Sequence, residues 1–197
     1  VNGQEVPAQL WVDVTDGKNG IALMNRTKFG HSFDKGQLRL SLLRATYSPD
    51  IYPNLGVNHI QYSLYPHSGD WKNGVWAEAE NYNVPVYAAE PPSLALVKTH
   101  ATRPSSDSLL IVSPASVVMS GIKQAEDGTN VIIRLAEVTG KETMASVTLP
   151  VAIKSANRVT ITEFPQSIGE KPVVAGRKIS VRLMPHEIVT LLIQTGN

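Results

Sequence analysis

Short apolar runs that alternate with polar residues and stop at turn residues are the feature that most constrains this fold. The run 37–42 alternates leucine with polar residues, as in a strand that buries one face. In the run 60–64 we expect the buried face at Ile60, Tyr62 and Leu64. Further runs stand at 131–136, 159–161 and 179–183, and the run 188–193 is apolar enough to be buried on both faces. About eleven short strands at this spacing predict an all-β chain built as antiparallel β-sandwiches.

Turn residues separate these runs. Asp and Gly combine at Asp16-Gly17, Asp34-Lys35-Gly36, Ser68-Gly69-Asp70 and Asp127-Gly128. Gly tolerates positive φ and Asp bonds to its own backbone, so each cluster predicts a tight turn. The 13 prolines belong in loops and at strand edges. The segment Gly74–Asn83 is open to two interpretations, a short helix or a strand with its connection.

The length of 197 residues suits one larger β domain or two small ones. Residues 101–107 are polar and contain Pro and Ser, with apolar strands on both sides. We therefore predict two domains, residues 1–104 and residues 105–197.

Charge and composition exclude several classes of function. Eighteen basic residues balance seventeen acidic ones, and Lys or Arg never occurs more than twice in a row. This pattern predicts no nucleic-acid partner. No apolar stretch reaches the roughly 20 residues that span a bilayer, so we expect no membrane partner. The chain has no cysteine, which excludes disulfides and thiolate metal sites and leaves the compartment open. It opens Val-Asn-Gly-Gln, which we interpret as a cut from something longer.

Several blocks of the chain also match a known family. The early blocks are Trp11–Asp16, Gly20–Asn25, Lys28–Gly30, Leu38–Arg44, Pro49-Asp50 and Tyr62–Trp71, and the later ones are Ile122–Gly128, Ile132–Leu135 and Met184–Leu191. This succession resembles the C-terminal half of glycoside hydrolase family thirty-eight, the zinc-dependent retaining α-mannosidases, and most of all the bacterial type. The resemblance covers nearly the whole chain.

The resemblance implies a division of labour. In that family an N-terminal catalytic domain supplies the zinc ligands and the carboxylate nucleophile. A large sandwich resembling galactose mutarotase and a small terminal sandwich follow. Residues 1–104 would be the end of the large sandwich and residues 105–197 the small one. The large sandwich would lack its first strands, which leaves open how its sheets close.

Retaining glycoside hydrolysis needs two carboxyl groups about 5 Å apart. Three pairs are near in sequence, namely Asp13 with Asp16, Glu78 with Glu80, and Glu126 with Asp127. Each has a structural interpretation: the first brackets a turn, the second faces solvent and the third opens an Asp-Gly hairpin. We therefore expect no catalytic pair in this chain.

Metal binding needs ligands that converge. The five histidines are His31, His59, His67, His100 and His186, and none stands at a zinc-ligand spacing. His59 and His67 are expected at the two ends of one strand, about 25 Å apart. We predict no cofactor in this chain and expect zinc in the missing catalytic domain. No phosphate-binding glycine loop or nucleophile elbow occurs either.

Three features are candidates for contact with substrate or with another domain. The resemblance places Arg44 and Asp50 along the interface toward the catalytic pocket, where Arg44 would donate paired hydrogen bonds; the alternative is a structural Arg44–Asp50 pair. The segment 65–71 offers a sugar platform in Tyr65, His67, Asp70 and Trp71, or else a structural corner. Trp11 and Trp76 are expected in the core or at an interface.

Three functions remain to be separated. The leading hypothesis is a non-catalytic part of an α-mannosidase, inactive alone. It would brace the catalytic domain, complete its pocket for α-mannosides and contribute to contacts in a homo-oligomer. The alternative is a stand-alone carbohydrate-binding module for mannosides, which an exposed row of rings would favour. A third is a purely structural sandwich. The leading hypothesis predicts exposed apolar patches larger than an ordinary monomer shows.

Overall fold

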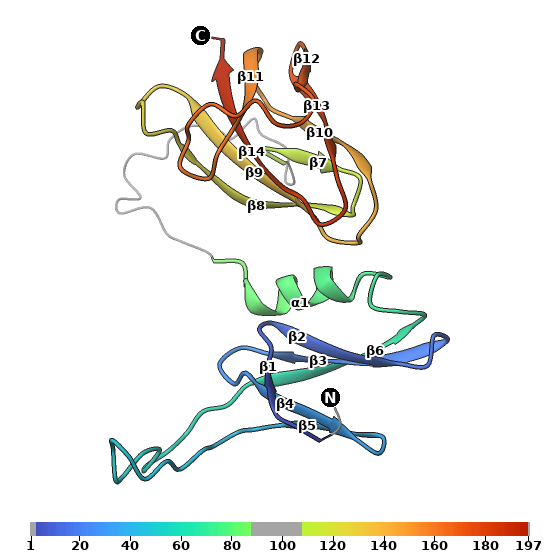
Figure 1. Ribbon diagram of the computed structural model, residues 1–197, viewed down its shortest axis with the longest axis vertical. Coiled ribbons are helices and arrows are strands. Elements are labelled where there is room, and N and C mark those ends of the chain that lie inside the picture. The colour runs from blue at the N-terminus through green and yellow to red at the C-terminus, as the bar shows by residue number, and fades with distance from the viewer. Residues whose placement is uncertain (1–2, 88–107, 197) are drawn as a thin grey trace, which may run out of the picture. The chain divides into compact units, whose positions relative to one another are not determined.

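The computed structural model describes residues 3–87 and 108–196 (Figure 1). Contacts within the chain divide it into two compact units, Val1–Leu94 and Ala95–Asn197. The described parts are almost entirely antiparallel β-structure, which confirms the predicted fold class. The predicted boundary after residue 104 and the segment 101–107 lie outside the described residues, so the boundary stays a prediction.

Two three-stranded sheets and one helix make up the first unit. One sheet has the order β1-β4-β5, with strands Val6–Pro7, Gly30–Asp34 and Gln37–Leu40. The other has the order β2-β3-β6, with strands Trp11–Thr15, Asn19–Asn25 and Tyr62–Ser68. The segment with two interpretations forms a helix, α1, Val75–Asn83.

Helix α1 covers one face of the β2-β3-β6 sheet, on the opposite side from the β1-β4-β5 sheet (Figure 1). Val75 and Ala79 of the helix are fully buried, as are Ala22 and Met24 of β3. Alternation along the strands places Trp11, which pairs with Met24, on the same face. The helix and the central strand of this sheet therefore enclose a small apolar core between them.

The other face of the sheet is poorly covered. Tyr62 and Leu64 of β6 remain 52% and 55% exposed. The predicted buried face at Ile60, Tyr62 and Leu64 is therefore wrong at its last two residues, although Leu23, paired with Leu64, is buried. The reason is that this face looks toward the β1-β4-β5 sheet, whose short strands do not extend over β6.

Between the two sheets lies an open cavity of about 450 Å³. Its apolar lining comes from both sheets, namely from Val6, Val12, Val14, Phe33 and Leu38. The buried imidazole of His31 also lines it, and the Nε2 of that ring has no hydrogen-bond partner within the part of the chain that the structure describes. The sheets of the first unit thus enclose space that their own side chains do not fill.

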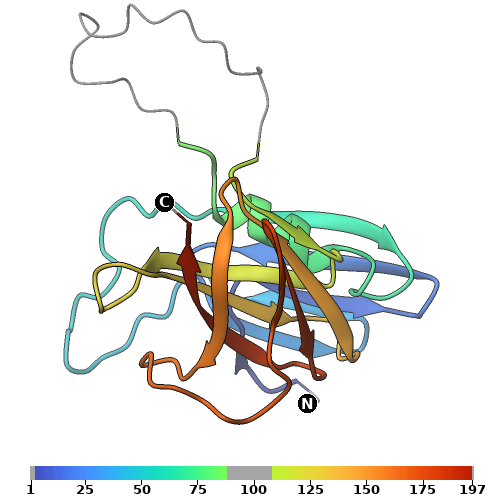
Figure 2. The same ribbon diagram turned by 90° about the horizontal axis from the view of Figure 1, so that it is seen from above.

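The loop between β5 and β6, residues 41–61, runs outward from both sheets of this unit, as Figure 1 and Figure 2 show. It carries exposed apolar side chains, among them Tyr47, Ile51, Tyr52, Leu55 and Val57. Among the described residues, no helix has the length and apolar character that crossing a membrane requires.

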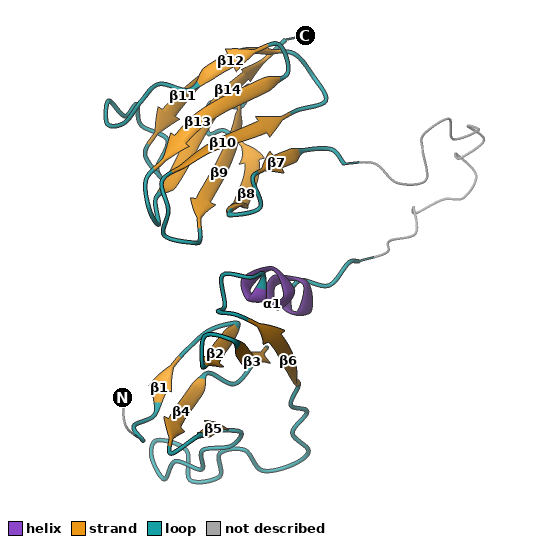
Figure 3. Ribbon diagram, turned by 90° about the vertical axis from the view of Figure 1, so that its right-hand side faces the viewer, coloured by secondary structure: helices purple, strands orange, loops and turns teal. Residues whose placement is uncertain are grey.

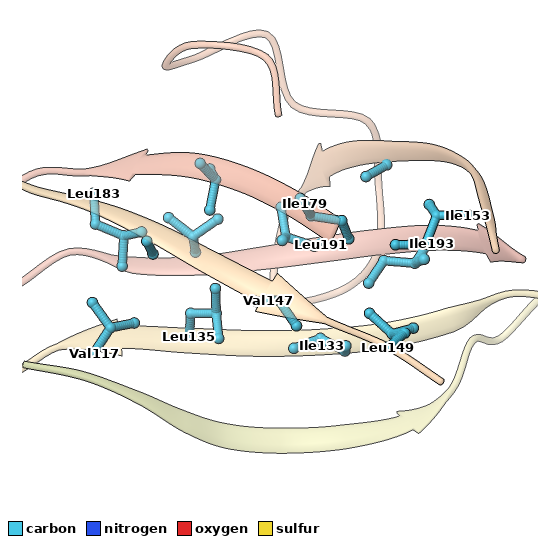
Figure 4. Packing of buried hydrophobic residues seen from close by; sticks show 14 residues of the cluster. Val117, Ile133, Leu135, Val147, Leu149, Ile153, Ile179, Leu183, Leu191 and Ile193 are labelled. Carbon is cyan, nitrogen blue, oxygen red and sulfur yellow. The ribbon is translucent and has the colours of Figure 1, made fainter. Parts of the chain in front are cut away.

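The second unit is a complete sandwich of two four-stranded sheets (Figure 3). The first sheet has the order β12-β13-β10-β7, with strands Val173–Ala175, Lys178–Leu183, Thr143–Thr148 and Ile111–Ser113. The second has the order β11-β14-β9-β8, with strands Ile153–Val159, Ile188–Thr195, Val131–Glu137 and Val117–Gln124. Their inward side chains form one apolar core, in which Ile179 and Leu183 face Leu135, Leu191 and Ile193 (Figure 4).

Strand β14 confirms the prediction for the run 188–193 from Val189 onward, whereas Ile188 at its start is exposed. It lies inside its sheet between β11 and β9, and Val189, Leu191 and Ile193 point into the main core. On the other face Leu192 packs with Ile132 and Val159 in a second cluster. The strand expected at 159–161 is wrong at its end, because a turn follows Val159 in which Thr160 donates its N–H to the carbonyl of Phe164. Ile161 is consequently exposed.

Candidate functional site

A buried pair joins β6 to β2 in the first unit. The Nε2 of His67 lies 2.8 Å from Oδ1 of Asp13, and the two side chains are 3% and 4% exposed. In this arrangement Nε2–H donates to the carboxylate. Asp13 Oδ2 is buried and has no partner among the described residues. Asp13 does not bracket a turn as predicted, because it lies in β2 opposite Ala22.

Gly20 makes this pair possible. It lies in β3 directly opposite His67, between the two strands that carry the pair. A Cβ at residue 20 would lie 2.3 Å from Cε1 of the His67 ring. The imidazole therefore crosses the central strand over a position without a side chain and reaches Asp13.

Aromatic residues surround this pair on the helix-covered face. Tyr65 stacks beside His67 with ring centroids 6.1 Å apart. Trp71 contacts Trp11 at 5.7 Å, and the ammonium of Lys72 lies 5.6 Å from the Trp71 ring. Both of these Trp side chains are half-buried, as is Trp76 on α1. Three of the predicted site residues, Tyr65, His67 and Trp71, thus come from one corner of the unit.

The corner between β6 and α1 is a hydrogen-bonded turn. Gly69 has a φ of 73° and donates its N–H to the carbonyl of Lys18. Asp70 accepts the Lys72 N–H through Oδ1 at 2.9 Å, and its carbonyl accepts the Asn73 N–H. Pro66 stays within β6, opposite Ile21. These contacts explain the conformation of the corner, while its binding to a sugar stays a prediction.

Arg44 and Asp50 lie on the outward loop 41–61. The Arg44 side chain is 83% exposed, and its Nη1 is 4.0 Å from Oε1 of Glu5. Asp50 uses Oδ1 to accept the N–H of Tyr52 at 2.9 Å. Arg44 and Asp50 therefore do not form the expected structural pair, because each has a different partner. Most of the Arg44 guanidinium faces solvent. The sequence-predicted site residues form two separate groups, one at the corner and one on this loop.

The candidate carboxylate pairs have structural partners. Asp16 accepts the N–H groups of Asn19 and Lys18 at 2.7 and 2.8 Å, and these bonds lower its pKa. Glu78 and Glu80 are exposed on α1. Asp13, the other member of the first pair, bonds to His67.

The third pair, Glu126 and Asp127, lies in the hairpin between β8 and β9. Asp127 accepts the N–H groups of Asn130 and Thr129, which lowers its pKa to about 2. Glu126 forms an ion pair with Lys123. Within residues 3–87 and 108–196, no three His, Asp or Glu side chains converge as metal ligands would. His100 lies outside these residues.

One cleft contains residues that the sequence reasoning missed. Arg26, which follows β3, donates through Nε to the carbonyl of Tyr82 at 3.0 Å, and through Nη1 to Gln61 Oε1 at 2.9 Å. Together with Ile60 and Tyr62 these residues line a shallow cleft of about 410 Å³. The segments involved are 35 and 56 residues apart, so no local pattern indicated the cleft.

Two family models and several known proteins match the sequence of this chain. The family model for the "Glycosyl hydrolases family 38 C-terminal beta sandwich domain" matches residues 116–191. That for the "Glycosyl hydrolases family 38 C-terminal domain" matches residues 1–52. The chain is 33% identical over 155 residues to Alpha-mannosidase G of Dictyostelium discoideum, which covers 77% of this chain and 14% of that protein. It is 30% identical to Alpha-mannosidase 2C1 of Homo sapiens over 96% of this chain and 18% of that protein.

Solved structures show the same fold. A crystal structure of an alpha-mannosidase from Enterococcus faecalis matches 98% of this chain and 21% of its own, with a TM-score of 0.72 and 16% identity. A glycosyl hydrolase family 38 protein from the same organism matches with a TM-score of 0.74 and 14% identity, over 98% of this chain and 23% of its own. The chain spans less than a fifth of the length of the two curated relatives described above.

Proposed function

Because the chain belongs to glycosyl hydrolase family 38, whose C-terminal domain models it matches, we propose that it forms the non-catalytic wall of a retaining α-mannosidase. The acid, the nucleophile and the zinc ion reside on other parts of a longer polypeptide. Within it, this region braces the catalytic domain and completes one side of the pocket for terminal α-mannosides.

The single observation that carries this proposal is the incomplete interior of the first unit. Its two sheets enclose a cavity of about 450 Å³, and Leu64 of β6 is more than half exposed. Exposed apolar surface of this kind costs free energy in water and ordinarily marks an interface. The second unit has a closed core, so the open interior is a property of the first unit alone. Further strands of the longer polypeptide would fill it.

The outward loop 41–61 supplies the contact with the catalytic domain. Arg44 is the strongest candidate in it, because its guanidinium is largely unengaged and its aliphatic stem is exposed. A free guanidinium fork binds a carboxylate or adjacent sugar hydroxyl groups through two parallel hydrogen bonds. Asp50 already holds the loop backbone at Tyr52, so it positions the loop.

Zinc does not fit the described residues. Catalytic zinc takes three protein ligands from His, Asp, Glu or Cys, and no such set converges in residues 3–87 and 108–196. The buried His67 already donates to Asp13 and is enclosed by Gly20 and Tyr65. The metal therefore belongs to the proposed catalytic domain, and no step of the reaction is assigned to this chain.

The Arg44 role is tested in the longer enzyme. We expect Arg44→Ala to lower kcat/KM for an aryl α-mannoside by about tenfold to hundredfold, the loss expected for hydrogen bonds to a charged group. Arg44→Lys should restore part of it, because a lysine keeps the charge without the fork. Arg39→Ala is the matched control, an exposed arginine on β5 whose guanidinium bonds to Gln37. Equal activity of the Arg44→Ala and Arg39→Ala enzymes would contradict the proposal.

A further inference from the structure

The outer edge of β2 is a strand edge that the described part of the first unit leaves unpaired. Strand β2 pairs with β3 on one side and ends the β2-β3-β6 sheet on the other. Two hydrogen bonds show which of its backbone groups face β3. Asp16 donates its N–H to the Asn19 carbonyl at 3.1 Å, and Asn25 donates to the Leu10 carbonyl at 2.9 Å. Because backbone groups alternate in direction along an antiparallel strand, the even-numbered residues of β2 bond to β3.

Asp13 and Thr15 therefore point their N–H and C=O groups away from β3. Neither N–H group has a hydrogen-bond partner among the described residues. Trp11 has the same orientation, but its N–H already bonds to the Gln9 carbonyl at 2.8 Å. Unpaired edge groups of this kind are a template on which a further strand adds through backbone hydrogen bonds.

The opposite edge of the same sheet, at β6, is less suited to a further strand. Gly69 donates its N–H to the Lys18 carbonyl at 2.8 Å, so the odd-numbered residues of β6 bond to β3. Pro66, which lies opposite Ile21, consequently faces outward. Proline has no N–H group, and the β6 edge therefore lacks a donor within the strand.

The cavity between the two sheets follows the edge of β2. Residues 12–15 of β2 all line it, whereas β6, which the structure describes throughout, contributes none of its lining. Val6, Phe33 and Leu38 form the apolar wall on the side of the other sheet. A strand added to β2 would continue the sheet alongside this cavity, with every second side chain directed toward that wall.

We propose that an extended strand from the rest of the longer enzyme pairs with the outer edge of β2 and fills the cavity with its apolar side chains. The identity of this partner rests on the proposed function, since the chain spans only 14% and 18% of two relatives. Carbonyl groups of the added strand accept the N–H groups of Asp13 and Thr15. A second copy would bring its own β2 to this edge, whose Val12 and Val14 already line a cavity.

Amide hydrogen exchange, resolved to single residues by electron-transfer fragmentation in a mass spectrometer, tests this pairing. In the 197-residue chain we expect the amides of Asp13 and Thr15 to exchange rapidly, because neither is hydrogen-bonded. In the longer enzyme both should exchange about a hundredfold more slowly, or slower still. Val12 and Val14 are matched internal controls, since they face β3 and should be protected in both proteins.

Rapid exchange of Asp13 and Thr15 in the longer enzyme would overturn the proposal. Slowing of the Leu64 amide at the β6 edge in their place would show that the strand joins the other edge. Slow exchange of either amide in the 197-residue chain would show that the edge is already occupied there, by a second copy if dilution restores rapid exchange. Rapid exchange of Val12 or Val14 would contradict the register of β2 on β3. The Arg44→Ala assay measures activity and not pairing, so either proposal can fail without the other.

Discussion

Two buried carboxylates illustrate how differently this chain compensates charge that is removed from water. Glu137, at the end of β9, accepts N–H groups from Thr139, Gly140, Lys141 and His186. Asp13 has only one partner, His67, and its second oxygen has none among the described residues. Burying an ionised group is costly unless it is paired and hydrogen-bonded. Glu137 therefore ties two loops of the second unit together, while Asp13 depends on a single side chain.

Glu137 predicts how the second unit responds to acid. Burial raises its pKa, but hydrogen bonds from Thr139, His186 and Gly140 lower it more, to about 2 from 4.5. The unfolded chain therefore binds this proton more readily than the folded one. The stabilisation is fully present above about pH 4.5 and is lost as the pH falls toward 2. Glu137→Gln should lower the free energy of unfolding at pH 7 by about 1–3 kcal/mol and flatten this acid dependence.

Urea unfolding followed by far-ultraviolet circular dichroism measures this effect, since residues 108–197 contain no Trp or Tyr. Glu142→Gln is the control. Glu142 is about half exposed and pairs with Arg182, so its loss should cost about 0–1 kcal/mol. An unchanged acid profile in the Glu137→Gln chain would contradict the role of this residue.

The His67–Asp13 pair predicts a large coupling in the first unit. His67→Ala leaves the Asp13 carboxylate buried without a partner, which should cost about 3–5 kcal/mol. Replacing both residues by Ala should cost less than the sum of the two single changes. Urea unfolding followed by tryptophan fluorescence measures these costs, because Trp11 and Trp71 contact each other on the helix-covered face that also carries the pair. His59→Ala, on the outward loop, should change little. Strictly additive costs would show that the pair is not coupled.

Among the strands, the local sequence pattern correctly predicted those whose apolar face is covered by other strands of the chain. The runs that became β9, β13 and β14 lie within the closed sandwich, where the side chains that alternate inward are buried. The same alternation was wrong for the exposed face of β6, because burial depends on what covers a strand. Asp13 was assigned to a turn because its partner is 54 residues away, and a local pattern carries no such register.

Among the site residues, sequence placed Tyr65, His67, Asp70 and Trp71 in one segment but could not show which side chains were engaged. The ring of His67 lies in the interior because Gly20 leaves room for it in the adjacent strand. The Arg26 cleft depends on three elements that meet only in the folded unit. Such contacts follow from long-range pairing, which is set by the whole hydrophobic pattern.

Strand β6 allows a comparison between this chain and the longer enzyme. Leu64→Ser should change the stability of the 197-residue chain by less than about 0.5 kcal/mol, because the side chain is already more than half exposed. In the longer enzyme, where we propose that this face is covered, the buried hydroxyl should cost about 1–3 kcal/mol. Urea midpoints of both proteins measure this. Ile161→Ser, on an exposed turn of the second unit, should have little effect in either. Equal effects of Leu64→Ser in both would contradict a covered face.

For the whole molecule, the two units differ in how well they stand alone. The second unit buries a continuous apolar core between two four-stranded sheets. The first has three-stranded sheets, an open cavity and an apolar outward loop. The family match extends over both units, while the chain spans 14% and 18% of two relatives. A supporting region of a larger enzyme accounts for all of these features.

An assay of the purified chain on an aryl α-mannoside, with and without added zinc, shows whether this region carries catalytic groups. For a non-catalytic region we expect no hydrolysis above the buffer rate in either condition, and zinc-dependent activity in the longer enzyme assayed beside it. Hydrolysis by the 197-residue chain itself would place the catalytic groups within these strands and contradict a supporting role.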